Sequence, residues 1–185
     1  YENNGRSSLP WRKPVYSSPY SILVAEFMLQ QTTAEQAKEV FPKFLEKFPT
    51  VSTLAGSQKS EILDIIGELG LAYRAERMKK TAKIIEGQYE GKVPNDKERL
   101  LNLPGVGDYI ANSVLCYGFN VKAPVIDTNT GRIISRIFDM NVKGRLRNSK
   151  NLWTTAEDLL PDSRFREFNF GLLDLGALIC QKQDT

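Results

Sequence analysis

Three short segments of this 185-residue chain carry side chains that could perform chemistry. The sequence contains no histidine, so proton transfer must rest on carboxylates, hydroxyls, amides, lysines or cysteines. In PYSILVAEFMLQQTT, Glu26 is the one charged residue of a stretch that is apolar nearly all round a helix. Burial raises the pKa of a carboxyl group, which suits a general acid or base near neutral pH. Alternatively, Glu26 reaches the surface or pairs with an arginine.

The second segment is APVIDTNTGRIISRIF, in which Asp127 ends a short apolar run and precedes a helix. An aspartate in this position commonly caps a helix by accepting hydrogen bonds from its first N–H groups. The same carboxylate, kept ionised by those groups, could stabilise positive charge on a sugar during cleavage of a glycosidic bond. The spacing alone leaves both interpretations open.

The third segment, LNLPGVGDYIANS, places Gly105 and Gly107 directly before an apolar helix. Glycines allow a tight turn and the close approach of a ligand, and the first N–H groups of a helix attract anions. Because NDKERLLNL before them also suits a helix, the segment predicts a helix–hairpin–helix. No strand precedes the glycines, so a DNA phosphate is favoured over a nucleotide. A plain glycine turn between packed helices fits the spacing equally well.

The elements that must position these segments are all expected to be helices. Strand-like alternation is nearly absent, and apolar residues recur with helical spacing. We expect helices at about residues 21–31, 33–48, 57–66, 74–89, 108–118, 130–138, 149–160 and 164–179, with a short one before the glycines. The predicted fold class is therefore all-α.

The apolar runs, the net charge and the cysteine content indicate where the protein acts and what it could bind. No apolar run approaches the roughly 20 residues that cross a bilayer, so we expect no membrane association. The net charge of +3 permits a polyanionic partner without demanding one. Arg74 and Arg77 share a predicted helix and could contact phosphates without reading bases. Cys116 and Cys180 do not suggest a disulfide scaffold, so we expect an intracellular protein, in the cytoplasm or nucleoid. We also expect the protein to be a monomer.

The chain resembles the helix–hairpin–helix, glycine/proline-rich loop and aspartate (HhH-GPD) superfamily of DNA glycosylases, which includes endonuclease III and the mismatch glycosylases. The matching blocks, in family order, are LPWR, AEFMLQQT, GLAYRAERM, LPGVGDYIA, VIDTNTGRIISRIF and FNFGLLDLGALIC. The resemblance implies a six-helix lobe over residues 20–121 and a second lobe made of residues 1–19 with 122–185. Double-stranded DNA would bind in a cleft between the lobes, with the target base flipped into it.

The resemblance also implies roles for individual residues. Asp127, with Asn129 beside it, matches the family's aspartate, and Glu26 matches the catalytic glutamate of the adenine-specific branch. Members that cleave the DNA strand carry a lysine where this chain has Tyr109, and a tyrosine cannot form a Schiff base. We therefore expect a monofunctional glycosylase, in which water attacks the sugar, an abasic site remains and Tyr109 lines the pocket.

Residues expected to contact DNA follow from the same blocks. Gln30 and Gln31 would enter the gap left by the flipped base. Leu71 is either an apolar wedge between bases or a core leucine. Arg74 would contact the DNA backbone, as would the hairpin around the two glycines.

Two cofactor expectations accompany the resemblance. The backbone carbonyls of Leu101, Leu103 and Val106 could hold a monovalent cation beside a DNA phosphate. Many members end with four cysteines that hold a 4Fe–4S cluster, whereas here Cys180 alone stands at the first ligand position. The chain as written therefore cannot bind the cluster, which would require further cysteines in a longer natural chain.

The blocks TTAEQAK and GLAYRAE resemble the short members that remove thymine or uracil opposite guanine in mismatched DNA. We favour that substrate. Glu26 followed by MLQQT fits the removal of adenine opposite guanine or 8-oxoguanine nearly as well. A helical DNA-binding module without catalysis is a third interpretation, and the isolated carboxylate of Glu26 argues against it.

Overall fold

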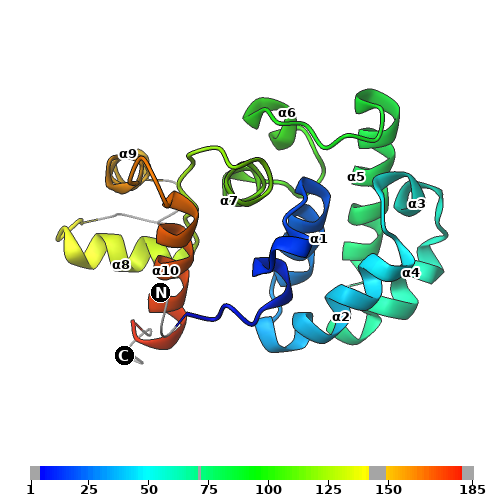
Figure 1. Ribbon diagram of the computed structural model, residues 1–185, viewed down its shortest axis with the longest axis horizontal. Helices are drawn as coiled ribbons and strands as arrows, with labels where there is room; N and C mark the ends of the chain where they lie inside the picture. The colour runs from blue at the N-terminus through cyan, green and yellow to red at the C-terminus, as the bar shows by residue number, and fades with distance from the viewer. Residues whose placement is uncertain (1–4, 71, 142–148, 181–185) are drawn as a thin grey trace. The chain divides into compact units, whose positions relative to one another are not determined.

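A computed structural model describes residues 5–70, 72–141 and 149–180. Every regular element within these ranges is helical, which confirms the all-α fold class. The α-helices are α1 Pro19–Leu29, α2 Ala34–Lys47, α3 Val51–Gly56, α4 Lys59–Ile66, α5 Tyr73–Tyr89, α6 Lys97–Leu101, α7 Asp108–Ser113, α8 Thr128–Ile137, α9 Lys150–Leu159 and α10 Phe165–Leu178 (Figure 1). Helix α3 lies outside the predicted ranges, because 6 residues show too little periodicity to be recognised. Among the described residues, no helix combines the length and apolar composition that a membrane span requires.

The chain folds into two compact units. We call Ser7–Phe119 the hairpin unit, because it contains the predicted helix–hairpin–helix. We call the described residues of Tyr1–Arg6 and Asn120–Thr185 the split unit, because it combines two segments that are far apart in the sequence. Helices α1 to α7 belong to the hairpin unit, and α8 to α10 belong to the split unit.

Residues 7–19 lie in the hairpin unit, whereas we expected the whole N-terminal arm to join the second lobe. The physical reason is aromatic packing on α2. The ring of Trp11 meets that of Phe41 edge-on, with the centroids 5.7 Å apart. Tyr16 contacts the same ring at 5.2 Å. Such pairs contribute about 0.5–1.5 kcal/mol beyond the burial of their area.

Helix α1 runs through the interior of the hairpin unit. Ser18 caps it by accepting a hydrogen bond from the N–H of Ser21, and Pro19 occupies its first turn, where an N–H lacks an intrahelical partner anyway. Residues 21–28 are all buried, as expected for a segment that is apolar on every face. The helix packs against α2, α5 and α7, so Glu26 is carried into the core.

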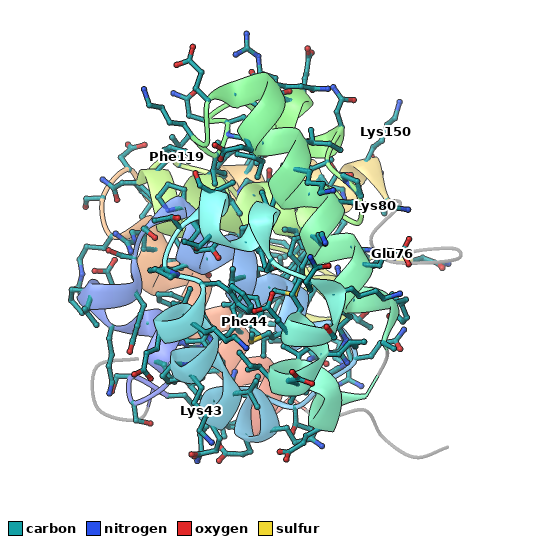
Figure 2. All side chains as sticks on the ribbon, turned by 90° about the vertical axis from the view of Figure 1, so that its right-hand side faces the viewer. Lys43, Phe44, Glu76, Lys80, Phe119 and Lys150 are labelled. Carbon is teal, nitrogen blue, oxygen red and sulfur yellow. The ribbon has the colours of Figure 1, made fainter. Side chains whose placement is uncertain are left out.

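Helix α2 is amphipathic and packs along α1. A capping box between Thr33 and Gln36 begins it. Phe44 is fully buried among the helices, whereas its sequence neighbour Lys43 points outward (Figure 2). Burying a phenylalanine side chain contributes about 2 kcal/mol, so this face of α2 stabilises the core of the hairpin unit.

In the split unit, α8 packs against α9 and α10. A buried apolar cluster contributes to the core of this unit: Ile126, Ile134, Leu152 and Ala156. Gly176 lets α10 approach α8 closely, because a Cβ at that position would lie 2.8 Å from the Cβ of Asn129. Asp174 of α10 accepts hydrogen bonds from Arg6, at 2.7 Å from Nε and 3.0 Å from the backbone N–H, which attaches Arg6 to this unit.

Candidate active site

Glu26 is buried in the hairpin unit, with only 6% of its surface exposed. The hydroxyl of Ser113, the last residue of α7, donates a hydrogen bond to its Oε1 atom. The alternative in which Glu26 reaches the surface is therefore wrong. A buried carboxyl group is costly unless it is hydrogen-bonded, and Ser113 supplies such a bond.

Two tyrosines share this neighbourhood. Tyr117 is buried in the π-helical segment Val114–Gly118 that continues α7. Burial raises the pKa of Tyr117 well above its ordinary value, and the nearby groups of Cys116, Tyr109 and Glu26 raise it further. Tyr117 therefore remains a neutral phenol. Tyr109, the second residue of α7, is half-buried, and the structure brings it into the same neighbourhood as Glu26.

Ser113 and Tyr117 were not singled out from the sequence. Both lie in IANSVLCYG, which has the pattern of an apolar α-helix. The backbone changes to a π-helix at Val114, so a period of 3.6 residues does not describe which residues share a face. Segments of π-helix often occur at functional sites. A serine within an apolar helix was the signal that could have identified Ser113.

The two glycines of the hairpin differ in conformation. Gly105 has φ +81°, in the left-handed region that favours glycine, and a Cβ there would lie 2.0 Å from Cδ of Arg77. Gly107 is extended, with φ −110° and ψ −177°. A Cβ on Gly107 would meet nothing within 4 Å. The turn therefore requires glycine at position 105, and at position 107 the glycine leaves the first N–H groups of α7 uncovered by a side chain.

The carbonyls proposed for a cation belong to the end of α6 and to the hairpin: Leu101, Leu103 and Val106. The carbonyl oxygen of Leu103 accepts the N–H of Val106 at 3.1 Å, which closes the turn. The side chains of Leu103 and Val106 are buried, so apolar contacts anchor the backbone of the hairpin. The cation itself stays a prediction.

Gln30 and Gln31 follow the end of α1. The amide Nε2 of Gln30 donates to the carbonyl oxygen of Gly105 at 3.1 Å, and NH1 of Arg77 donates to Oε1 of Gln30 at 2.9 Å. Gln31 is exposed and has a left-handed backbone, with φ 58°. The structure thus joins Gln30 to the hairpin. Leu71 lies outside the described residues.

The prediction that Arg74 contacts DNA is wrong for this structure. Its side chain is only 1% exposed. The guanidinium donates from NH1 to the carbonyl oxygen of Met28 at 2.8 Å and from NH2 to that of Leu69 at 3.2 Å. Helix ends leave carbonyl groups without intrahelical partners, and Arg74 satisfies one at the end of α1. Arg77, one turn further along α5, is the partly exposed arginine of this helix.

Asp127 is the N-cap of α8. Its Oδ1 accepts the N–H of Thr130 at 2.7 Å, while Oγ1 of Thr130 accepts the N–H of Asp127 at 2.8 Å, which completes a capping box. Asn129 donates from Nδ2 to Oδ2 of Asp127 at 3.4 Å. The capping interpretation is confirmed. These donors hold the half-buried carboxylate in one orientation at the positive end of α8. Its catalytic role, and a cleft shared with Glu26, stay predictions.

Cys180 is partly exposed just after α10, whereas Cys116 is buried. Burial alone would raise the pKa of the Cys180 thiol, but hydrogen bonds from Arg132 and Arg136 outweigh burial and hold the pKa below its ordinary value. NH1 of Arg136 lies 3.2 Å from Sγ. No metal is assigned to this cysteine.

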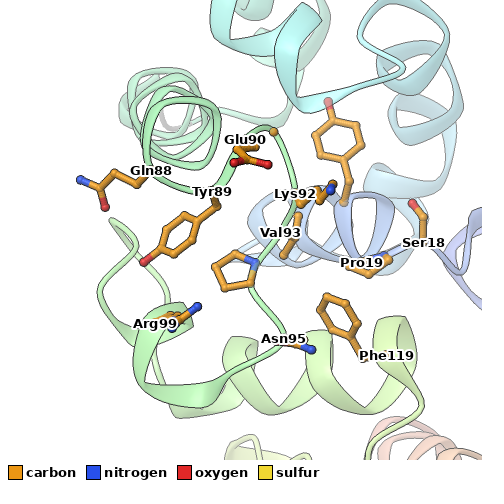
Figure 3. A pocket seen from close by; sticks show the side chains of 13 residues that line it. Ser18, Pro19, Gln88, Tyr89, Glu90, Lys92, Val93, Asn95, Arg99 and Phe119 are labelled. Carbon is orange, nitrogen blue, oxygen red and sulfur yellow. The ribbon is translucent and has the colours of Figure 1, made fainter.

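A cavity of about 660 Å³ opens elsewhere on the hairpin unit (Figure 3). It is lined by the start of α1, by the loop between α5 and α6, by Arg99 and by Phe119. Neither Glu26 nor Tyr109 lines it. The cavity is therefore separate from the predicted catalytic residues of this unit.

The helical hairpin and Asp127 both lie within a segment that matches a known protein family. The sequence model of the HhH-GPD superfamily of base excision DNA repair proteins matches residues 24–157. The chain belongs to this superfamily, as its sequence motifs indicated.

The chain is also similar to individual DNA glycosylases. Thymine/uracil-DNA glycosylase of Methanothermobacter thermautotrophicus is 39% identical over 179 residues, covering 96% of this chain and 80% of the relative. A solved structure of a thermostable thymine-DNA glycosylase superposes with a TM-score of 0.88 and 38% identity, covering 95% of this chain and 81% of that one. Adenine DNA glycosylase of Buchnera aphidicola subsp. Baizongia pistaciae is 35% identical, and the match spans all of this chain but only 52% of that protein. The chain is thus a DNA glycosylase of base excision repair rather than a non-catalytic module.

Proposed function

We propose that this glycosylase is monofunctional and removes thymine or uracil opposite guanine, leaving an abasic site. The monofunctional assignment rests on Tyr109. The family resemblance places it where strand-cleaving members have a lysine, and a phenol cannot form a Schiff base with the sugar. The base preference is supported by sequence identity, which is 39% with the thymine/uracil relative and 35% with the adenine relative.

In this proposal, Asp127 acts on the sugar. As the bond between C1′ and the base nitrogen breaks, the base leaves with the electron pair and positive charge develops on the sugar. The carboxylate of Asp127 stabilises that charge and orients the water. The water loses one proton as its oxygen bonds to C1′, and the departing base takes up one proton, so the overall step is a hydrolysis. Thr130 and Asn129 each donate to one of its oxygens, so its orientation is set before DNA binds.

Glu26 acts as the proton donor or relay for the leaving base. A buried carboxyl group can supply or relay a proton, and such transfer accelerates a reaction roughly 10²–10⁴-fold. The hydroxyl of Ser113 orients the group from one side by donating to Oε1. Tyr109 lines the pocket that receives the base.

The hairpin binds DNA without reading its sequence. The first N–H groups of α7, uncovered at Gly107, receive a phosphate, and the hairpin carbonyls hold a monovalent cation beside it. Gln30 and Gln31 occupy the gap left by the flipped base, and Leu71 is retained as a candidate wedge. We further propose that the enzyme acts as a monomer inside the cell.

Adenine removal opposite guanine or 8-oxoguanine is the alternative. The buried Glu26 favours it, since the resemblance matches this residue to the catalytic glutamate of the adenine-specific branch. The two functions can be separated with one set of duplexes.

The test incubates the protein with duplexes that carry T·G, U·G, A·G or A·8-oxoguanine pairs and then cleaves abasic sites with alkali. We expect strand breaks in the T·G and U·G duplexes after alkali and few breaks without it. If breaks appear only in the A·G and A·8-oxoguanine duplexes, the substrate is adenine and not thymine or uracil. The Asp127→Asn variant serves as the control for contaminating glycosylases.

A further inference from the structure

Arg77 links three elements of the hairpin unit. It lies on α5 and donates from NH1 to Oε1 of Gln30 at 2.9 Å. Gln30, which caps the end of α1, donates from Nε2 to the carbonyl oxygen of Gly105 at 3.1 Å. These two bonds connect α5, the end of α1 and the turn of the hairpin.

The rest of the Arg77 side chain is held as closely. A Cβ at Gly105 would lie 2.0 Å from Cδ and 2.5 Å from Nε of Arg77, so the arginine fits over this glycine. In addition, the guanidinium lies over the ring of Tyr73, 4.9 Å from the centroid. A cation over an aromatic face is attracted to it, so this contact helps to hold the guanidinium.

The chemistry of the two side chains also defines the direction of the Gln30 amide. An arginine has only donors, so the carbonyl end of the amide must face it. The NH₂ end then faces the carbonyl oxygen of Gly105, which can only accept. Without Arg77, the amide would have to be oriented when DNA binds, at a cost in side-chain entropy.

We propose that Arg77 is a positioning residue that holds Gln30 against the hairpin. The side chain that enters the gap left by the flipped base is thereby fixed relative to the phosphate bound at the start of α7. This inference rests on the proposed function for the role of Gln30. It assigns Arg77 an action through Gln30 and not a direct contact with DNA.

The test is a double-mutant cycle of Arg77→Met and Gln30→Ala. Methionine keeps an unbranched stem over Gly105 and removes the donors. The probes are a duplex containing a tetrahydrofuran abasic-site analogue opposite guanine and the same duplex undamaged. We expect each single variant to weaken binding of the analogue duplex about 10-fold, the scale of a hydrogen bond to a charged group. The undamaged duplex should bind with unchanged affinity.

The decisive measurement is the affinity of the double variant for the analogue duplex. If Arg77 acts through Gln30, the double variant should lose no more than either single variant, because the coupled effects are not additive. A loss of about 100-fold, the product of two independent effects, would overturn the proposal. Equal losses on both duplexes, with a shallower salt dependence, would also overturn it by assigning Arg77 to a phosphate.

Lys80→Met is the matched control, since it removes a positive charge from the same helix at a residue paired with Glu76 at 2.9 Å (Figure 2). Its effect should be additive with that of Gln30→Ala. Arg77→Lys, which keeps the stem and a donor, should recover part of the lost affinity even if Arg77→Met folds poorly. Excision of T·G by the parent chain is measured in parallel. Its absence would count against the proposed function, whereas additivity in the cycle would count against this inference.

Discussion

Ser113 donates a hydrogen bond to Oε1 of Glu26, although the two residues are 87 positions apart in the sequence. The bond joins the end of α7, where the π-helical segment begins, to the second half of α1. Helix α7 starts at the hairpin and carries Tyr109. The orientation of the buried carboxyl group therefore depends on the same helix that is proposed to bind a DNA phosphate.

Ser113→Ala should lower kcat for base excision about 10-fold. The change leaves Oε1 of a buried carboxyl without this donor, and such a loss costs about 1–3 kcal/mol. Ser57→Ala is the matched control, because Ser57 is also buried but donates to the carbonyl oxygen of Leu54 at 2.8 Å. Single-turnover excision should separate the two variants. Equal losses of kcat would show that the effect of Ser113 is not specific to Glu26.

Asp127→Asn should abolish excision and preserve DNA binding. Asparagine caps helices about as well as aspartate, so α8 should remain folded. The neutral amide cannot stabilise positive charge on the sugar. Asp127→Ala should in addition lower the free energy of unfolding by about 1 kcal/mol through loss of the cap. Gel-shift, excision and denaturant titration measure the three effects, and normal excision by Asp127→Asn would remove this residue from the mechanism.

Tyr109→Lys should introduce strand-cleaving activity, because an amine would then stand at the position of the lyase members' lysine. Borohydride should trap a covalent DNA adduct with this variant and none with the parent chain. Tyr109→Phe, which changes the same residue without adding an amine, should also give none. An abundant adduct with the parent chain would contradict the monofunctional assignment and indicate another lysine as nucleophile.

The two hairpin glycines should respond differently to alanine. Gly105→Ala should lower the free energy of unfolding by about 1–2 kcal/mol from backbone strain alone, with a further cost from the clash with Arg77. Gly107→Ala should be tolerated, because its backbone is extended and its Cβ site is open. Thermal melting measures both.

Gly107→Arg and Gly105→Val should weaken binding to all DNA sequences about equally. A change in base preference at constant affinity would contradict phosphate binding.

Arg74→Met should destabilise the hairpin unit without changing the electrostatics of DNA binding. The carbonyl oxygens of Met28 and Leu69 would lose a charged donor, which costs about 1.5–3 kcal/mol each. The melting temperature should therefore fall. The slope of log K against log salt should stay unchanged, whereas loss of a phosphate contact would reduce it by about 0.9. A reduced slope at normal stability would restore Arg74 to the DNA-contacting residues.

The local sequence determined the features that depend on neighbouring residues. The apolar stretch around Glu26 predicted a buried helix, because exposing apolar side chains to water on any face of the helix is unfavourable. An aspartate just before an expected helix indicated an N-cap, since the hydrogen bonds of a cap lie within one turn, and the structure adds Thr130 as its partner. The turn at Gly105 was likewise visible as a glycine before a helix.

Only the tertiary structure decided which partners distant residues find. Arg74 and Arg77 are alike in the sequence, yet the first is buried against carbonyl oxygens and the second is directed to Gln30 and Gly105. The donor for Glu26 depends on how α7 packs on α1, beside a π-helical segment that a period of 3.6 residues does not predict. Such pairings form only when whole helices pack against one another. They therefore cannot be predicted from any short segment of the sequence.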